Sequence, residues 1–299
     1  MLQTIGSLKA VVHEVEAPVL TAVCLHGLGL GPWLWDAWLP GLKAAGIRVI
    51  AAELPGHGSD AATDASLQDC VTAVTSCLDT LTGPVALVGH SVGGLVAQLA
   101  AVGRPLHAVV LVSPLPVGNV RMMPERGEIR SGLKLLPALL AGRPVKVGWA
   151  DYRASGLAQL DDTTARAVYD RITPWPNRLT RDLVRRPAID PLKMVAPVLI
   201  ALGKEDTLAP WTTIRLLADL YEGVCWRYDG VGHMGPVEPK GARMGEAVVG
   251  FLVEPVKPVV IESEGFRPDE GVGHTLRRER RGEEIMKKRS AYGQKKSAR

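Results

Sequence analysis

The fold is decided by residues 85–94, Val85-Ala86-Leu87-Val88-Gly89-His90-Ser91-Val92-Gly93-Gly94. The stretch begins with four apolar residues typical of a buried strand, and Leu95, Leu99 and Val102 extend it with helical spacing. Glycines stand two residues before and two residues after Ser91, in the pattern G-x-S-x-G. A strand that turns at once into a helix strains its central residue, and the glycines let neighbouring backbone approach without a Cβ clash. The pattern therefore predicts a sharp turn that exposes the Ser91 hydroxyl.

Short apolar runs recur on both sides of this turn and alternate with longer stretches of helical spacing. The predicted strands are Leu20–Leu25, Val49–Glu53, Val85–Gly89, Ala108–Ser113, Val198–Leu202 and Val224–Tyr228. This alternation predicts an α/β fold, a mostly parallel sheet with helices on both faces. Residues 8–16 are expected to pair antiparallel with residues 2–5 at the start of the sheet. Ser66 and Asp69 predict a capping box, and Pro239–Phe251 the last core helix.

A serine hydroxyl is a weak nucleophile and needs a base, which in turn needs an orienting carboxylate. Three histidines follow Ser91: His107, His233 and His274. His107 precedes a strand and belongs to the wrong edge of the sheet, and His274 lies in a charged tail. His233 lies in a glycine-rich loop directly after the last predicted strand, where it can be aimed at Ser91. His233 is therefore the candidate base.

The orienting carboxylate is expected at the end of an earlier strand, because the order serine, acid, histidine is typical of this turn pattern. The strand Val198–Leu202 is followed by Gly203-Lys204-Glu205-Asp206. Asp206 is the favoured acid and Glu205 its main competitor. A purely structural alternative for Asp206 is capping of the helix that starts near Pro210.

Acyl transfer develops an oxyanion that needs fixed N–H donors. The amide of Val92, directly after the serine and at a helix N-terminus, is one candidate. The other is the amide of Leu28, in the glycine-rich loop His26-Gly27-Leu28-Gly29-Leu30-Gly31 after the first long strand. His26 is expected to brace this loop.

Taken together, these motifs resemble the α/β-hydrolase-fold superfamily, in its capped serine esterase/lipase-like branch. The resemblance rests on His26-Gly27, Leu54-Pro55-Gly56-His57-Gly58-Ser59, Gly89–Gly94, the Gly203–Pro210 segment and Gly232-His233, in order and with ordinary spacing. It implies a serine hydrolase without cofactor or metal, in which Ser91 is acylated and then hydrolysed with His233 as base and Asp206 as orienting acid. It also implies a structural role for His57.

The substrate class stays open within this fold. A small-molecule carboxylic ester or lactone is the leading expectation. Acyltransferase, thioesterase or carbon–carbon bond hydrolase activity on the same three residues is the alternative, as is a non-catalytic ligand-binding homologue. Haloalkane dehalogenases and epoxide hydrolases carry an aspartate at the elbow, so Ser91 argues against both.

The chain is expected to divide into three parts. Residues 1–114 and 191–253 form the core, 115–190 a helical cap insertion, and 254–299 a basic, partly disordered C-terminal extension. The insertion has no convincing strand and holds 13 basic against 8 acidic residues, which favours a solvated helical surface. Its apolar residues offer candidates for substrate binding: Met122, Met123, Leu136 and Leu140.

The net charge of +4 belongs to the extension alone. Residues 1–253 hold 23 basic and 23 acidic residues, so the charge balance gives the core no nucleic-acid signal. The extension could contact an acidic partner. No apolar run is long enough for a transmembrane segment, the N-terminus lacks signal-peptide features, and the four scattered cysteines are expected to be buried free thiols. These features predict a cytoplasmic location.

Overall fold

The computed structural model describes residues 1–121, 134 and 136–255. Its sheet has eight strands in the order β1-β2-β4-β3-β5-β6-β7-β8. The strands are β1 (Leu2–Ile5), β2 (Leu8–His13), β3 (Leu20–Leu25), β4 (Ile47–Glu53), β5 (Val85–His90), β6 (Ala108–Val112), β7 (Val198–Gly203) and β8 (Val224–Tyr228). β2 pairs antiparallel with β1 and β4, and all other pairs are parallel.

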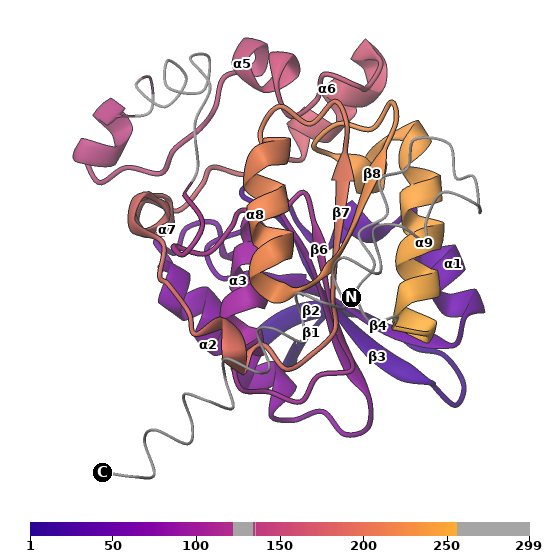
Figure 1. Ribbon diagram of the computed structural model, residues 1–299. Helices are drawn as coiled ribbons and strands as arrows, with labels where there is room; N and C mark the ends of the chain where they lie inside the picture. The colour runs from indigo at the N-terminus through magenta and orange to yellow at the C-terminus, as the bar shows by residue number, and fades with distance from the viewer. Residues whose placement is uncertain (122–133, 135, 256–299) are drawn as a thin grey trace, which may run out of the picture. The chain divides into compact units, whose positions relative to one another are not determined.

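Helices cover both faces of the sheet (Figure 1). On one face lie α2 (Leu67–Leu78), α3 (Val92–Ala101) and α8 (Trp211–Tyr221), and on the other α1 (Leu39–Ala44) and α9 (Ala242–Val253). Between β6 and β7 lie α5 (Trp149–Ala154), α6 (Asp162–Asp170) and α7 (Asn177–Asp182). The 3₁₀ turns are η1 (Pro32–Trp35), η2 (Gly58–Asp60), η3 (Leu183–Arg185), η4 (Pro191–Lys193), η5 (Gly235–Val237) and η6 (Pro239–Gly241).

The central strands are apolar because both of their faces are covered. Every residue of β3, β5 and β7 is buried, as a parallel sheet between two helix layers requires. The register pairs Leu25 with Gly89 and His90 with Val112, so these strands end level with one another. Their carboxyl ends therefore bring the following loops to one edge of the sheet, where open α/β folds place ligand sites.

The predicted α/β architecture is confirmed, with small shifts at element ends. β4 begins at Ile47, two residues early, because Ile47 pairs with Leu20. The predicted capping box is present: Ser66 Oγ accepts the Asp69 N–H, and the Asp69 carboxylate accepts the Ser66 N–H. The predicted final helix starts as a 3₁₀ turn at Pro239 and becomes α9 only at Ala242.

The division into core, cap and extension stays a prediction. The structure describes α5, α6 and α7 within the predicted insertion, and residues 136–140 are also helical. Met122, Met123 and the extension beyond residue 255 lie outside the described residues. All four cysteines are buried and unpaired, as expected, and burial raises the pKa of each thiol. Within the described ranges, no helix combines the length and apolarity needed to cross a bilayer.

The packing of α3 against β3 predicts a contrast between two helical glycines. A Cβ on Gly93 would lie 2.4 Å from the carbonyl oxygens of Leu25 and His26, whereas a Cβ on Gly250 in α9 would meet open space. Gly93→Ala should therefore destabilise the protein by about 1–3 kcal/mol. Gly250→Ala should stabilise it by up to about 1 kcal/mol through helix propensity.

The midpoint of urea unfolding measures both effects. Equal midpoints for the Gly93→Ala variant and the parent protein would show that α3 can move away from β3 at little cost.

Candidate active site

Ser91 occupies the turn between β5 and α3. Its backbone has φ +52° and ψ −118°, a conformation that residues other than glycine rarely adopt. Backbone hydrogen bonds hold it there: its N–H donates to Val112 O at 3.0 Å, and its carbonyl accepts the N–H groups of Leu115 and Gly94, both at 2.9 Å. A Cβ on Gly89 would lie 2.4 Å from Gly93 O, so the turn can close this tightly only with glycine. The structure thus places Ser91 where the motif predicts it.

Ser91, His233 and Asp206 lie in one line of hydrogen bonds. His233 Nε2 is 3.1 Å from Ser91 Oγ. His233 Nδ1 is 3.1 and 3.0 Å from the two carboxylate oxygens of Asp206. The His233 side chain is 9% exposed and that of Asp206 is fully buried, whereas Ser91 is only partly buried. The three residues come from the loops after β8, β7 and β5, so the parallel sheet brings them together.

The charges of this line favour an ionised Asp206 beside a basic imidazole. Burial alone would raise the pKa of Asp206, but His233, the Ser113 hydroxyl and the backbone N–H of Leu208 lower it below its usual value. Burial alone would lower the pKa of His233, but the adjacent Asp206 carboxylate raises it overall. The Nδ1 atom therefore carries the proton that faces Asp206, and Nε2 is free to accept a proton from Ser91.

Glu205, the alternative acid, does not reach His233. It is exposed, and only its backbone N–H contacts this region, donating to Val231 O at 3.0 Å. The Asp206 carboxylate also accepts the N–H groups of Leu208 and Ala209, at 2.9 and 3.0 Å. These bonds hold the turn before α8. Asp206 therefore accepts backbone N–H groups ahead of a helix, as in the structural alternative, and also contacts His233.

The loop after β3 lies directly beside Ser91. A Cβ on Gly27 would be 3.0 Å from the Ser91 Cβ. Leu30 N–H donates to Gly27 O at 3.2 Å and Gly29 has φ +72°, which closes a tight turn around Leu28. Neither the Leu28 nor the Val92 backbone N–H has an acceptor among the described residues. Both N–H groups are thus free to bind another acceptor.

Two buried histidines brace the loops around this site. His26 Nδ1–H donates to Gly27 O at 2.8 Å, and His26 Nε2 accepts the Leu54 N–H at 3.1 Å, which ties the loop after β3 to the end of β4. The His57 ring stands edge-on to His26, with 5.0 Å between ring centres. Burial lowers the pKa of both rings, so both are neutral. The structure agrees with the structural roles expected for them.

Sequence reasoning missed two further residues that contact the His233 loop. His90 Nε2–H donates to the carbonyl oxygen of His233 at 2.9 Å. Glu238 accepts the N–H groups of Gly232 and Met234, at 2.5 and 3.0 Å. His90 occupies the variable position of the G-x-S-x-G pattern and Glu238 follows His233 by five residues. Neither position signals its contact in one sequence, because the contact depends on how the loop folds back.

The segment between β6 and β7 contacts two of the loops that surround Ser91. Thr173 N–H donates to Gly29 O at 2.9 Å, and the Arg171 guanidinium lies 4.3 Å from the ring centre of Trp33. A Cβ on Gly232 would lie 2.8 Å from the Gln159 side chain. The insertion therefore packs against the loop that carries Leu28 and the loop that carries His233.

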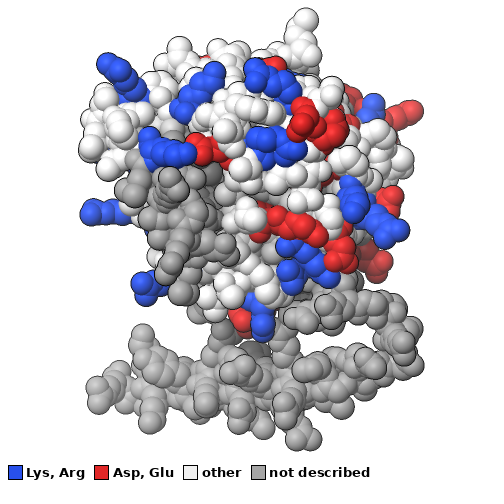
Figure 2. All heavy atoms as spheres, turned by 90° about the horizontal axis from the view of Figure 1, so that it is seen from above, with Lys and Arg blue, Asp and Glu red and all other residues white. Residues whose placement is uncertain are grey.

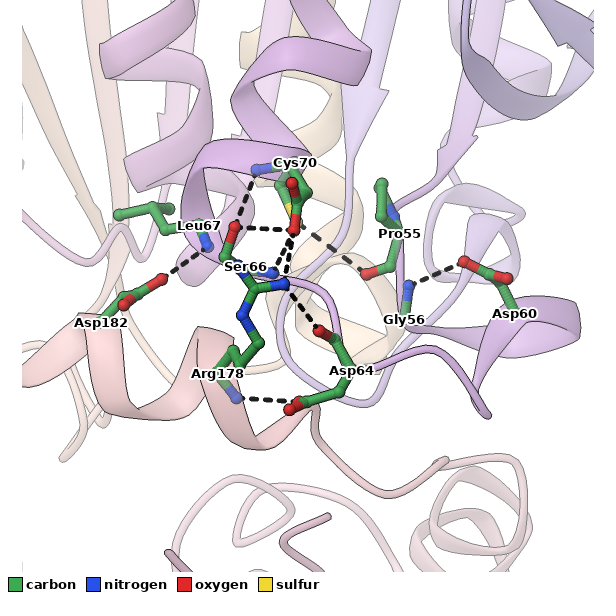
Figure 3. Close-up of polar contacts among 10 residues, drawn as sticks. Pro55, Gly56, Asp60, Asp64, Ser66, Leu67, Cys70, Arg178 and Asp182 are labelled. Carbon is green, nitrogen blue, oxygen red and sulfur yellow. Dashed lines mark hydrogen bonds and ion pairs between the residues drawn. The ribbon is translucent and has the colours of Figure 1, made fainter. Parts of the chain in front are cut away.

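A polar cluster fastens α7 to the start of α2 (Figure 3). Arg178 donates from its backbone N–H to the Asp64 carboxylate at 2.9 Å, and its guanidinium reaches Asp69 at 3.4 Å. Asp182, one turn along α7, accepts the Leu67 N–H at 2.9 Å. These bonds join residues more than a hundred positions apart, and they place the end of the insertion on the core.

The predicted substrate contacts stay a prediction, because Met122 and Met123 lie outside the described residues. Leu136 and Leu140 are 46% and 80% exposed. Two of the described arginines of this segment form ion pairs: Arg153 with Asp162, and Arg166 with Asp170. Figure 2 shows basic and acidic side chains interspersed over the face that carries α5 and α6. Among the described residues, no group of three His, Cys, Asp or Glu side chains is arranged to hold a metal ion.

Comparisons with known proteins agree with the fold. The sequence model of the alpha/beta hydrolase family matches residues 22–250, and the chain belongs to that family. It is 33% identical to phospholipase YtpA of Bacillus subtilis over 215 residues, which cover 67% of this chain and 81% of that protein. It is 40% identical to (E)-2-((N-methylformamido)methylene)succinate hydrolase of Acinetobacter baylyi over 88 residues, 28% of this chain and only 32% of that protein.

A solved structure, a thermophilic esterase from Thermogutta terrifontis, has the same fold. It superposes with a TM-score of 0.66 at 19% identity, covering 84% of this chain and 98% of that one. Relatives that are hydrolases, together with the family match, support a hydrolase.

The buried neutral histidines predict a loss of stability in mild acid. The pKa of His90 is lowered to about 3, mainly by burial, and burial also lowers the pKa of His26 and His57. In the unfolded chain these rings titrate near pH 6.5, so below that pH the unfolded state binds protons that the folded state does not. The free energy of unfolding should fall with decreasing pH below about 6.5, approaching about 1.4 kcal/mol per pH unit for each ring.

Urea unfolding between pH 8 and 5 measures this dependence, and His57→Gln should reduce the slope below pH 6.5. The raised pKa of His233 has the opposite effect on stability. It stabilises the folded protein fully below pH 6.5, and this stabilisation is lost as the pH rises above 6.5. A free energy of unfolding that does not change between pH 6.5 and 5 would contradict neutral buried rings.

Proposed function

We propose that the protein is a serine hydrolase that cleaves a carboxylic ester or lactone through an acyl-enzyme on Ser91. The proposal is carried by one observation, the unbroken line from Ser91 Oγ through His233 to the buried Asp206 carboxylate. The 33% identity to a protein named as a phospholipase supports an ester as the substrate class. Phospholipases act on esters, and a small-molecule ester fits a serine nucleophile.

The reaction proceeds in two halves. Ser91 Oγ attacks the ester carbonyl carbon while its proton moves to His233 Nε2, and the resulting imidazolium is stabilised by Asp206. The carbonyl oxygen becomes an oxyanion that accepts the N–H groups of Leu28 and Val92. The C–O bond to the leaving alkoxide breaks as His233 returns the proton to that oxygen. The products of this half are a free alcohol and an acylated Ser91.

The second half repeats the same steps with water as the nucleophile. His233 takes a proton from water, the hydroxide oxygen bonds to the acyl carbon, and the bond to Ser91 Oγ breaks as Oγ regains a proton. A carboxylic acid leaves, and Ser91 is restored. With a lactone, the alcohol and the acid end up on the same product molecule.

We further propose that residues 115–190 cap this site. Support comes from the contacts of Thr173 and Arg171 with the Leu28 loop and from the cluster of Arg178 and Asp182 on α2. Four buried, unpaired thiols fit a reducing compartment, and we propose the cytoplasm as the location.

Replacement of the nucleophile tests the proposal directly. Ser91→Ala should lower kcat for a short-chain p-nitrophenyl ester on the order of 10⁴-fold or more, because the acyl-enzyme cannot form. A fluorophosphonate probe should add its mass to the parent protein and not to this variant. The exposed Ser7→Ala serves as the matched control and should behave like the parent. Equal turnover by Ser91→Ala and the parent would rule out Ser91 as the nucleophile.

Two neighbouring carboxylates offer a second, internally controlled test. Asp206→Asn should lower kcat on the order of 10³–10⁴-fold, because the amide no longer stabilises the imidazolium or fixes its tautomer. Glu205→Gln, one residue away and exposed, should leave kcat within about twofold of the parent, as is usual for surface changes. Steady-state kinetics with the same ester measure both. A larger loss in Glu205→Gln than in Asp206→Asn would reverse the assignment.

A further inference from the structure

The carboxylate of Glu238 is buried against the backbone that carries His233. Glu238 is 5% exposed and ends the 3₁₀ turn η5. Its two oxygens accept the backbone N–H groups of Gly232 and Met234, the residues on either side of His233. The loop thus folds back so that one side chain holds the main chain before and after the imidazole.

His90 holds a third backbone group of this segment. Its Nε2–H donates to the His233 carbonyl, and the two rings lie 4.9 Å apart. Two N–H groups and one C=O around His233 are therefore fixed by buried side chains from two different parts of the chain. The direction of the imidazole toward Ser91 follows from this backbone, because only the two side-chain torsions of His233 are left to adjust.

We propose that Glu238 is a positioning residue for His233, holding the backbone on both sides of the base and placing a negative charge near its ring. The inference rests on the proposed function of Ser91 and His233, and it adds a second carboxylate to the one that contacts the imidazole directly.

The chemistry of the contact requires a carboxylate. Two N–H donors converge on one side chain, and a glutamine in the same pose would offer one acceptor oxygen and turn its NH₂ group toward the second donor. Burying a carboxylate costs free energy, and an uncharged side chain can also accept N–H groups from a loop. We therefore expect the negative charge of Glu238 to have a role of its own. A Cβ on Gly232 would lie 3.0 Å from Glu238 Oε1, so the backbone of Gly232 packs closely against this carboxylate.

The charge of Glu238 acts on the imidazole together with that of Asp206. Burial raises the pKa of the Glu238 carboxyl, and the N–H groups of Gly232 and Met234 and the nearby His233 oppose this rise. Asp206 and Glu238 both raise the pKa of His233, whereas burial lowers it. His90, which faces the same ring from the end of β5, is neutral, because burial lowers its pKa to about 3. Glu238 thus favours the imidazolium that forms during proton transfer, without touching the substrate.

The test reads the titration of His233 itself, so it does not depend on turnover. The full chain labelled with ¹³C at histidine Cε1 gives one titrating signal for His233, assigned by its loss in His233→Gln. In Glu238→Gln the midpoint of this titration should move to lower pH, because the imidazolium loses a neighbouring negative charge. The matched control Glu246→Gln, on the exposed side of α9, should leave the midpoint unchanged.

Ester kinetics form the second arm. Glu238→Gln should lower kcat about tenfold with little change in KM, since misplacing the base affects the chemical step. The acidic limb of kcat should move to lower pH along with the NMR midpoint. Glu238→Asp keeps the charge but cannot span both N–H groups, so it should lose kcat while its acidic limb stays closer to that of the parent.

The outcomes separate this inference from the proposed function. A Glu238→Gln protein with the parent's His233 midpoint and kcat overturns the inference even if its melting temperature falls. If Glu238→Gln does not fold, an unchanged kcat in Glu238→Asp overturns it instead. A parent protein that reacts with neither fluorophosphonate nor ester, but whose His233 midpoint moves in Glu238→Gln, disproves the proposed function and supports the role of Glu238.

Discussion

The strained turn at Ser91 is the constraint on which the rest of the structure depends. A positive φ at a serine persists only where the surroundings hold it, and here β6 fixes the Ser91 N–H while glycines let α3 approach β3 and β5. The same approach brings the first turn of α3 against the end of β3. The loop after β3 and the turn after β5 are therefore close neighbours.

Electrostatics around this turn separate groups that carry charge from groups that stay neutral. Asp206 is buried and ionised, whereas His26, His57 and His90 are buried and neutral. The neutral rings serve as hydrogen-bonding braces between loops. Charge is concentrated around His233, whose pKa is raised while theirs are lowered. One residue type thus takes opposite roles in the same site, and the difference comes from Asp206, whose carboxylate is hydrogen-bonded to the ring of His233.

The insertion is joined to the loops around Ser91 and to α2 as well. Thr173 and Arg171 contact the loop that carries Leu28, and the bonds of Arg178 and Asp182 fix α7 on the start of α2. The turn around Leu28 is held from two sides, by the hydrogen bond of His26 to Gly27 O and by that of Thr173 to Gly29 O. Its conformation therefore depends on both parts of the chain.

By itself, the sequence determined the strand, turn and helix around Ser91, the positions of the apolar strands along the chain, and the loops that hold His233 and Asp206. These follow from local rules: hydrophobic periodicity, glycine spacing and the position of polar residues at strand ends. Only the tertiary structure decided that Asp206, and not Glu205, faces His233, because adjacent residues point in different directions at a strand end. It also decided the contacts of His90 and Glu238, since these hydrogen bonds, unlike those of the Ser66–Asp69 capping box, follow no standard spacing and depend on how the His233 loop folds back.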